Sequence, residues 1–399
     1  MTDLDLSTLG LDEGGHLLLR RVMRQVEIGE RVTVRGTDDN LAVHLRGFCR
    51  QEGHEVVWPE GSGDVVAHVV RGGAESGRWR GALRAGKHDA SRSGAIAEQP
   101  PPTWGLAARG ATVEAGGPAF DFRLDHKAEV WADEAARLYE QAAAAQWDPA
   151  TAIDWQAAFE LPDEIEDAVV QVMTYLIENE TAALLVPARF LAQIHPHFRE
   201  VMQLLAIIAA DEARHIEVFT RRATLKRKAL GLSTVGGQAS LKTLIDEPDF
   251  ALASFLLSVL GEGSFLSLLW FLREHAPDPV TRQVAHLAAQ DEARHVAFGL
   301  AHLSRHCALD PTMHARLADA IERRHDALRD TAGLNELVFD ALVLLAAGSW
   351  EHDALRRGFQ RVQALKEDMD QGRQKRLLKL GFDEAQAEEL SALHTRNFM

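Results

Sequence analysis

The pentapeptide Asp-Glu-Ala-Arg-His occurs twice in this chain, at residues 211–215 and 291–295. In each copy a glutamate and a histidine are three residues apart. On an α-helix such residues lie on one face, so both side chains can reach the same metal ion. Carboxylate oxygen together with imidazole nitrogen suits iron or manganese. The repeat therefore predicts two pairs of metal ligands, Glu212 with His215 and Glu292 with His295.

A di-metal site in a helical bundle needs one more glutamate from the helix that precedes each motif. Glu262 lies about thirty residues before the second motif and supplies one of them. Before the first motif there are two candidates, Glu178 and Glu180. We prefer Glu180 because it lies on the more apolar face of its predicted helix, and we keep Glu178 as the alternative. The predicted set is four carboxylates and two histidines.

A single Glu-x-x-His on a helix is ordinarily a solvated surface pair. Two identical copies, each preceded by a glutamate in an apolar helix, are harder to explain in that way. Buried glutamates are costly unless a partner compensates their charge, and four that face each other would have to take up protons. Two divalent cations would cancel the four negative charges. We therefore interpret the repeat as a di-metal site.

Proline and acidic residues mark the starts of several long helices in the second half of the chain. Short breaks between long helices favour antiparallel neighbours in a bundle. The four metal-bearing helices are predicted at residues 163–194, 197–230, 248–275 and 279–308. Further helices are predicted at residues 311–330, 333–350, 353–377 and 383–395.

One stretch is apolar enough to be mistaken for a membrane span. Residues 251–272 carry a single charge, Glu262. A hydropathy scan would select this segment. We prefer a helix buried inside the bundle, because a lone glutamate at the centre of such a helix needs a function. The sequence therefore predicts no membrane partner.

The part of the chain before the bundle divides into two regions. Residues 1–72 alternate between strand and helix patterns in the order β-α-β-α-β-β. Residues 73–120 are rich in glycine and proline, which is typical of a linker or an extended segment. We predict a small α/β domain at 1–72, a linker at 73–120 and a helical di-metal domain at 121–399.

The doubled Glu…Glu-x-x-His pattern resembles that of ferritin-like di-iron carboxylate proteins. The fuller Asp-Glu-x-Arg-His string is similar to the motif of bacterial multicomponent monooxygenase hydroxylases. The resemblance covers about residues 165–308. It implies a mainly α fold, a ferritin-like four-helix bundle with extra C-terminal helices, preceded by the βαβαββ domain. It also implies that the six predicted ligands hold two Fe ions, with Mn or mixed Mn/Fe as alternatives, and that O₂ reacts there.

The same resemblance implies roles for the other residues of each motif. Asp291 would hold the imidazole of His215, and Asp211 would hold that of His295. Such carboxylates fix the tautomer of a ligating histidine and raise its basicity. Arg214 and Arg294 would balance the two aspartates.

Residues 1–72 resemble the TusA/SirA family of sulfur-carrier domains in element order and in the segments 29–32 (Gly-Glu-Arg-Val) and 53–56 (Gly-His-Glu-Val). The carrier cysteine of that family begins the first helix in a Cys-Pro-x-Pro motif, where residues 13–16 of this chain are Glu-Gly-Gly-His. The resemblance therefore implies a docking domain without the catalytic thiol. Cys49 is expected to be buried in packing.

Composition limits the partners. The formal net charge of −16 argues against nucleic acid, because no excess of cations is available to displace counterions. The two cysteines, Cys49 and Cys307, fit a reducing compartment, and the N-terminus has no basic segment followed by an apolar run. We therefore expect a cytoplasmic location.

The predicted function is an O₂-activating di-iron oxidoreductase, an oxygenase or oxidase acting on an apolar or aromatic small molecule. No Gly-x-Gly-x-x-Gly follows a strand, so the electron donor is expected to be a separate ferredoxin or reductase. The alternative is a metal-binding interaction or sensor protein whose front domain docks a partner. The apolar end, Phe398-Met399, is expected to dock on the bundle or to pack in a homodimer.

Overall fold

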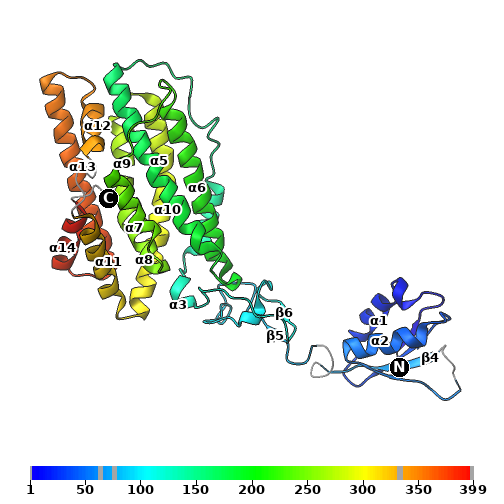
Figure 1. The fold of residues 1–399 in the computed structure, drawn as a ribbon. Helices are drawn as coiled ribbons and strands as arrows, with labels where there is room; N and C mark the ends of the chain where they lie inside the picture. Colours follow the sequence, from blue (N-terminus) through cyan, green and yellow to red (C-terminus); the bar gives the residue numbers. More distant parts are fainter. Residues whose placement is uncertain (1, 62–65, 74–78, 330–335, 396–399) are drawn as a thin grey trace. The chain divides into compact units, whose positions relative to one another are not determined.

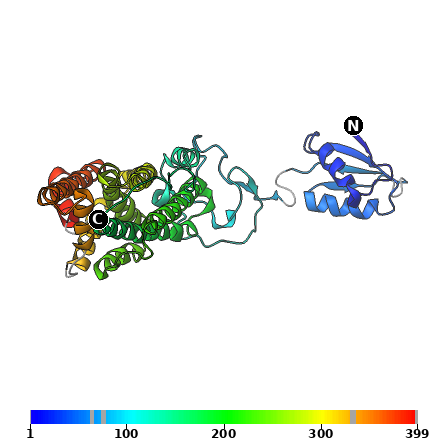
Figure 2. The same cartoon turned by 90° about the horizontal axis from the view of Figure 1, so that it is seen from above.

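The computed structural model describes residues 2–61, 66–73, 79–329 and 336–395. The chain divides into two compact units, and the division in the sequence lies between Asp121 and Phe122. Figures 1 and 2 show both units from two directions. Each unit is described by itself below.

The first unit contains a four-stranded sheet with the strand order β1-β2-β4-β3. Strand β1 is parallel to β2, whereas β2 and β3 are each antiparallel to β4. Two helices pack on this sheet and bury its valines, as the alternating pattern predicts. The predicted βαβαββ order is confirmed. The elements are β1 (Thr2–Asp5), α1 (Gly15–Met23), β2 (Arg31–Arg35), α2 (Leu41–Glu52), β3 (Glu55–Val57) and β4 (Val66–Val70).

Two features of this unit bear on the sequence predictions. Cys49 lies in the core of the sheet and helices, and burial raises the pKa of its thiol to about 12. A thiol with such a pKa is a poor nucleophile at neutral pH. Within the predicted linker, β5 (Leu83–Arg84) pairs antiparallel with β6 (Thr112–Val113). The kinship with sulfur carriers stays a prediction.

The second unit is helical, and its centre is a four-helix bundle (Figure 1). Pro162 and three acidic residues begin the first of these helices, and the side chain of Asp278 caps the last by accepting from the backbone N–H of Thr281 at 2.8 Å. The mainly helical class predicted from the sequence is confirmed. The bundle consists of α5 (Asp163–Leu191), α6 (Arg199–Ala223), the run α8–η6–α9 (Phe250–His275) and α10 (Pro279–Leu309).

The third member of the bundle differs from the single helix predicted at 248–275. It begins as α8 (Phe250–Ser254), continues as the π-helix η6 (Phe255–Glu262) and ends as α9 (Gly263–His275). This run is long and apolar enough to cross a membrane, but 78 % of its most apolar window is buried inside the protein. The residues of this run are apolar on every face of the helix. Its sequence therefore has no hydrophobic periodicity that would distinguish a π-helical turn from an α-helical one.

Shorter helices surround the bundle. Helix α6 ends at Ala223 rather than near residue 230, and a helix that the sequence did not predict, α7, follows it. Phe398-Met399, at the predicted apolar end, lie outside the described residues. The surrounding helices are α3 (Lys127–Val130), α4 (Ala135–Ala144), α7 (Val235–Ile245), α11 (Met313–Leu328), α12 (Glu336–Ala347), α13 (His352–Lys379) and α14 (Glu384–Thr395).

A buried histidine on α10 makes the stability of this unit depend on pH. His302 is fully enclosed, and burial lowers its pKa to about 3. The folded state therefore excludes a proton that the unfolded chain binds below a pKa of about 6.5. The contribution of neutral His302 to the free energy of unfolding is fully present above pH 6.5, and it is lost as the pH falls from 6.5 toward 3. Between pH 7.5 and 5.5 we expect a loss of about 1.4 kcal/mol.

The measurement is urea unfolding at both pH values for the wild type and His302→Phe, which cannot take up the proton. The variant should lose less stability on acidification by about the same 1.4 kcal/mol. The exposed His352, replaced by Gln, is the matched control. Equal pH dependence in the wild type and His302→Phe would contradict the prediction.

Candidate metal centre

Six predicted side chains meet inside the four-helix bundle. Each residue is at most 5 % exposed. They form two groups, and within each group the ligand atoms lie within 4.8 Å of one another. One group contains Glu180, Glu212, His215 and Glu292, and the other contains Glu212, Glu262, Glu292 and His295. Glu212 and Glu292 belong to both groups, so each would help to hold both of two bound cations.

The two histidines present the same ring atom to the cluster. His215 Nδ1 lies 3.2 Å from a Glu212 oxygen, 3.4 Å from Glu292 and 3.6 Å from Glu180. His295 Nδ1 lies 2.9 Å from Glu212 and 3.4 Å from Glu292. Nitrogen and oxygen atoms at these separations surround positions that a cation could occupy.

The structure separates the two glutamates that the sequence left as alternatives. Glu180 is buried in the cluster. Glu178 is half-buried and lines a groove between α5 and α7, together with Gln238 and Lys242. The two residues point differently because side chains two apart on a helix do not share a face.

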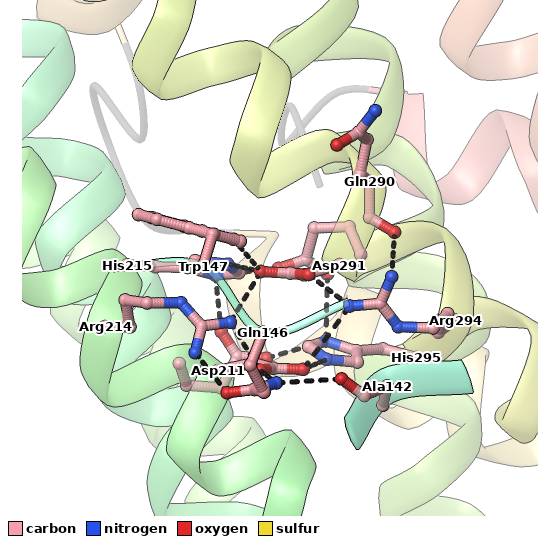
Figure 3. A network of polar contacts seen from close by, with 12 residues as sticks. Ala142, Gln146, Trp147, Asp211, Arg214, His215, Gln290, Asp291, Arg294 and His295 are labelled. Atoms are coloured by element: carbon pink, nitrogen blue, oxygen red, sulfur yellow. Dashed lines mark hydrogen bonds and ion pairs between the residues drawn. The ribbon is translucent and has the colours of Figure 1, made fainter. Parts of the chain in front are cut away.

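A layer of aspartates and arginines lies beside the two histidines, His215 and His295 (Figure 3). His215 Nε2 is 3.2 Å from Asp291, and His295 Nε2 is 3.3 Å from Asp211. Each aspartate thus contacts the histidine of the other motif, which is the pairing that the family resemblance implies. Arg214 donates to both aspartates, at 2.5 Å to Asp211 and 2.8 Å to Asp291. Arg294 donates to Asp291.

Two residues of this layer were not predicted from the sequence. Gln146 Nε2 donates to Asp211 at 2.8 Å, and Trp147 Nε1 donates to Asp291 at 2.8 Å. The Arg214 guanidinium lies 4.6 Å from the centre of the indole ring. Both residues follow α4, which packs on α6 and α10. An isolated Gln-Trp pair far from the motifs gives no sequence signal, because only the fold brings it to the site.

The protonation of the cluster follows from burial and from its own charges. Burial, and then the charge of Glu212, raises the pKa of Glu180 to about 8. Burial and Glu292 raise the pKa of Glu262 well above its usual range. For His215, burial alone would lower the pKa, but its contacts with Asp291 and the glutamates raise it well above 6.5. In the absence of cations, protons on Glu180, Glu262 and His215 therefore offset the negative charge of the cluster.

The donor atoms fit a pair of divalent cations. Several buried atoms of the cluster have no hydrogen-bond partner: Glu180 Oε1, Glu212 Oε1, both Glu262 oxygens, Glu292 Oε2 and His295 Nδ1. His295 Nδ1 is near Glu212 Oε1 but is not aligned for a hydrogen bond. Buried polar atoms are normally satisfied, and each exception needs an explanation. Two dications would satisfy these atoms and neutralise four carboxylates.

A small cavity adjoins the cluster. Glu180, Glu262 and Glu292 form one wall, and the others are mostly apolar: Asn179, Ala183, Leu244, Leu257, Gly261 and Phe265. A second apolar cavity, between α5, α6, α8 and α10, shares Leu257 with the first. The donor cluster therefore faces apolar space rather than bulk water.

A glutamate from each of two helices, with Glu-x-x-His from each of two others, is the ligand pattern of ferritin-like di-metal carboxylate proteins. The bundle and the cluster described above have that pattern.

No protein-family model matches the chain, and no curated protein does. Among solved structures, the chain is similar to a variant of R2-like ligand-binding oxidase with aerobically reconstituted Mn/Fe cofactor, at 18 % identity and a TM-score of 0.45 over 63 % of this chain and 93 % of that one. It is also similar to protein 19 with aldehyde deformylating oxidase activity from Synechococcus, at 17 % identity and a TM-score of 0.41 over 57 % and 96 %. Similarity at this level carries no substrate or activity to this chain.

We expect Asp291→Asn to weaken metal binding by about 10–100-fold, which is the usual cost of removing a partner of a ligating histidine. The amide retains the size of the side chain but removes the charge that faces His215 Nε2 and Arg214. Titration of the apoprotein with Fe(II) under anaerobic conditions measures the effect. Asp148→Asn, on the surface near Trp147, is the control. Unchanged affinity in Asp291→Asn would show that His215 needs no such partner.

Proposed function

We propose that this protein is a di-metal oxidoreductase that activates O₂, as an oxygenase or an oxidase, and acts on an apolar or aromatic small molecule. The observation that carries the proposal is the set of four buried carboxylates and two histidines, several of whose ligand atoms have no other partner. Two Fe ions are the proposed cofactor. Mn or mixed Mn/Fe is the alternative, because the ligand set does not choose between these metals.

Each part of the site has a role in this proposal. Glu212 and Glu292 would bridge the cations, while Glu180 and Glu262 would each bind one of them. Asp291 and Asp211 hold the Nε2 atoms of the histidines and leave the Nδ1 atoms for the metals. When bound, the metals supply the redox chemistry for reducing O₂. The apolar side chains that line the small cavity beside Glu180 and Glu262 would contact an apolar substrate next to the metals.

An external electron donor, a ferredoxin or a reductase, completes the proposal. A hydrogen-bonded chain runs from half-buried Trp147 through Asp291 to His215 and offers a route for electrons into the cluster. A cytoplasmic location stays a prediction, and it agrees with the two free cysteines.

The test is O₂ consumption by protein loaded with Fe(II) under anaerobic conditions. Consumption in proportion to bound iron, with oxidation of that iron, supports the oxidoreductase. Binding of two Fe(II) per chain without O₂ consumption supports the alternative, a metal-binding interaction or sensor protein. Cavity variants such as Leu257→Ala then serve to compare apolar compounds as substrates, because Leu257 lines both cavities.

A further inference from the structure

The segment that carries Glu262 is built differently from the other three. Glu180 lies on α5, and the two Glu-x-x-His motifs lie on α6 and α10, all of which are α-helices without a π-helical segment. Glu262 is the last residue of the π-helix η6. Wide π-helical turns are rare and are found mostly at functional sites. What holds this turn in place therefore determines where Glu262 lies.

An arginine from outside the bundle contacts this turn. Helix α13 packs on α9 and on η6. Its Arg376 donates from Nε to the backbone carbonyl of Val259 at 2.6 Å. Val259 lies three residues before Glu262, within one turn of the π-helix. The guanidinium also covers Gly263, where an added Cβ would lie 2.4 Å from Arg376 Cζ. The arginine thus contacts the backbone on both sides of Glu262.

This arrangement is costly for the protein. Burial, and then the neighbouring charge of Arg373, lowers the pKa of Arg376 to about 10, so the side chain is still a cation at neutral pH. Its Nη2 atom is enclosed and has no hydrogen-bond partner. An enclosed donor without a partner lowers stability. An apolar side chain would fill this space at a lower cost in free energy, so packing alone does not explain the arginine.

We propose that Arg376 is a positioning residue of the metal centre. It fixes the backbone from Val259 to Gly263 and so sets where Glu262 meets the cation shared with Glu212, Glu292 and His295. The inference rests on the proposed function, because it requires Glu262 to be a ligand. It adds a residue from α13, outside the four bundle helices, to those that determine metal binding.

The experiment is anaerobic titration of the full-length apoprotein with Fe(II), with the number of ions per chain and the affinity of each as readouts. In Arg376→Gln, we expect the cation near Glu262 to bind about 10–100-fold more weakly, with the other little changed. Gly263→Ala should give the same split, because its Cβ displaces the guanidinium without removing it. Arg376→Lys retains a donor for Val259 and should restore most of the affinity.

Arg324→Gln is the matched control. Arg324 is a buried arginine whose pKa is likewise lowered to about 10 by burial, but it donates to the hydroxyls of Ser240 and Thr243 on α7. This variant should lose stability and still bind both cations normally. Wild-type binding of both cations in Arg376→Gln and Gly263→Ala, or equal weakening of both, would overturn the inference. If Arg376→Gln does not fold, Gly263→Ala decides. Failure of the wild type to bind two cations would instead overturn the proposed function.

Discussion

Glu212→Ala is expected to abolish the binding of both metal ions while the bundle stays folded. Glu212 belongs to both ligand groups, so its loss removes a donor from each cation. The expected drop in affinity exceeds the roughly 10–100-fold that follows loss of an outer partner. The stability of the folded apoprotein should not fall, because the substitution removes one of four carboxylates that face each other. Burial and the charge of Glu212 raise the pKa of Glu180, and that repulsion disappears.

Elemental analysis after anaerobic loading with Fe(II) measures this effect, and thermal unfolding with and without metal provides a second readout. The wild type should bind about two ions per chain and be stabilised by them, since a ligand that binds only the folded state raises its stability. Glu178→Ala is the control, because Glu178 lies on the same helix as Glu180 but outside the cluster. Two ions in Glu212→Ala, or a loss of metal in Glu178→Ala, would contradict the assignment.

Arg222→Ala is expected to destabilise the helical unit by about 3–5 kcal/mol, which is the usual cost of removing one partner from a buried ion pair. Arg222 is fully buried on α6. Its guanidinium bonds to Glu166 on α5 at 2.6 and 3.0 Å and to Asp278, the cap of α10, at 2.9 Å. It also donates to the hydroxyl of Thr281 at 2.8 Å. Without the arginine, two buried carboxylates are left without their cation.

Chemical denaturation of the apoprotein measures this loss. Arg227→Ala is the matched control, because Arg227 pairs with Asp163 and Asp167 at the surface, where water and salt screen the pairs. It should leave stability nearly unchanged. Arg222→Met, which retains volume but no charge, should still be strongly destabilised. A small effect of both Arg222 variants would show that Glu166 and Asp278 find protons or water instead.

Local patterns predicted most of the architecture. The helices predicted from residue 163 onward begin close to their predicted starts, because proline and acidic residues there favour the first turn of a helix, whereas no start was predicted for α3, α4 or α7. The alternating valines of β2 fixed the buried face of the sheet in the same way. These patterns depend on residues that are close together in the sequence, so they can be recognised without knowledge of the tertiary structure.

The two copies of Asp-Glu-Ala-Arg-His each named four residues in and around the cluster, and spacing on a helix puts Glu and His of each copy on one face. The choice between Glu178 and Glu180 was weaker, since it depended only on which face of the helix is the more apolar. The structure shows Glu180 in the cluster and Glu178 in the groove under α7, the helix that the sequence did not reveal.

By itself, then, the sequence determined the helical class, the α/β unit and the chemistry of the six side chains, because each depends on residue type and short spacing. Only the tertiary structure decided what surrounds them: the π-helical turn that carries Glu262, the Arg376 contact from α13, and the placement of Gln146 and Trp147 beside the aspartates. The physical reason is that these contacts join residues far apart in the chain. Their energies depend on packing and on desolvation, and neither leaves a periodic mark in the sequence.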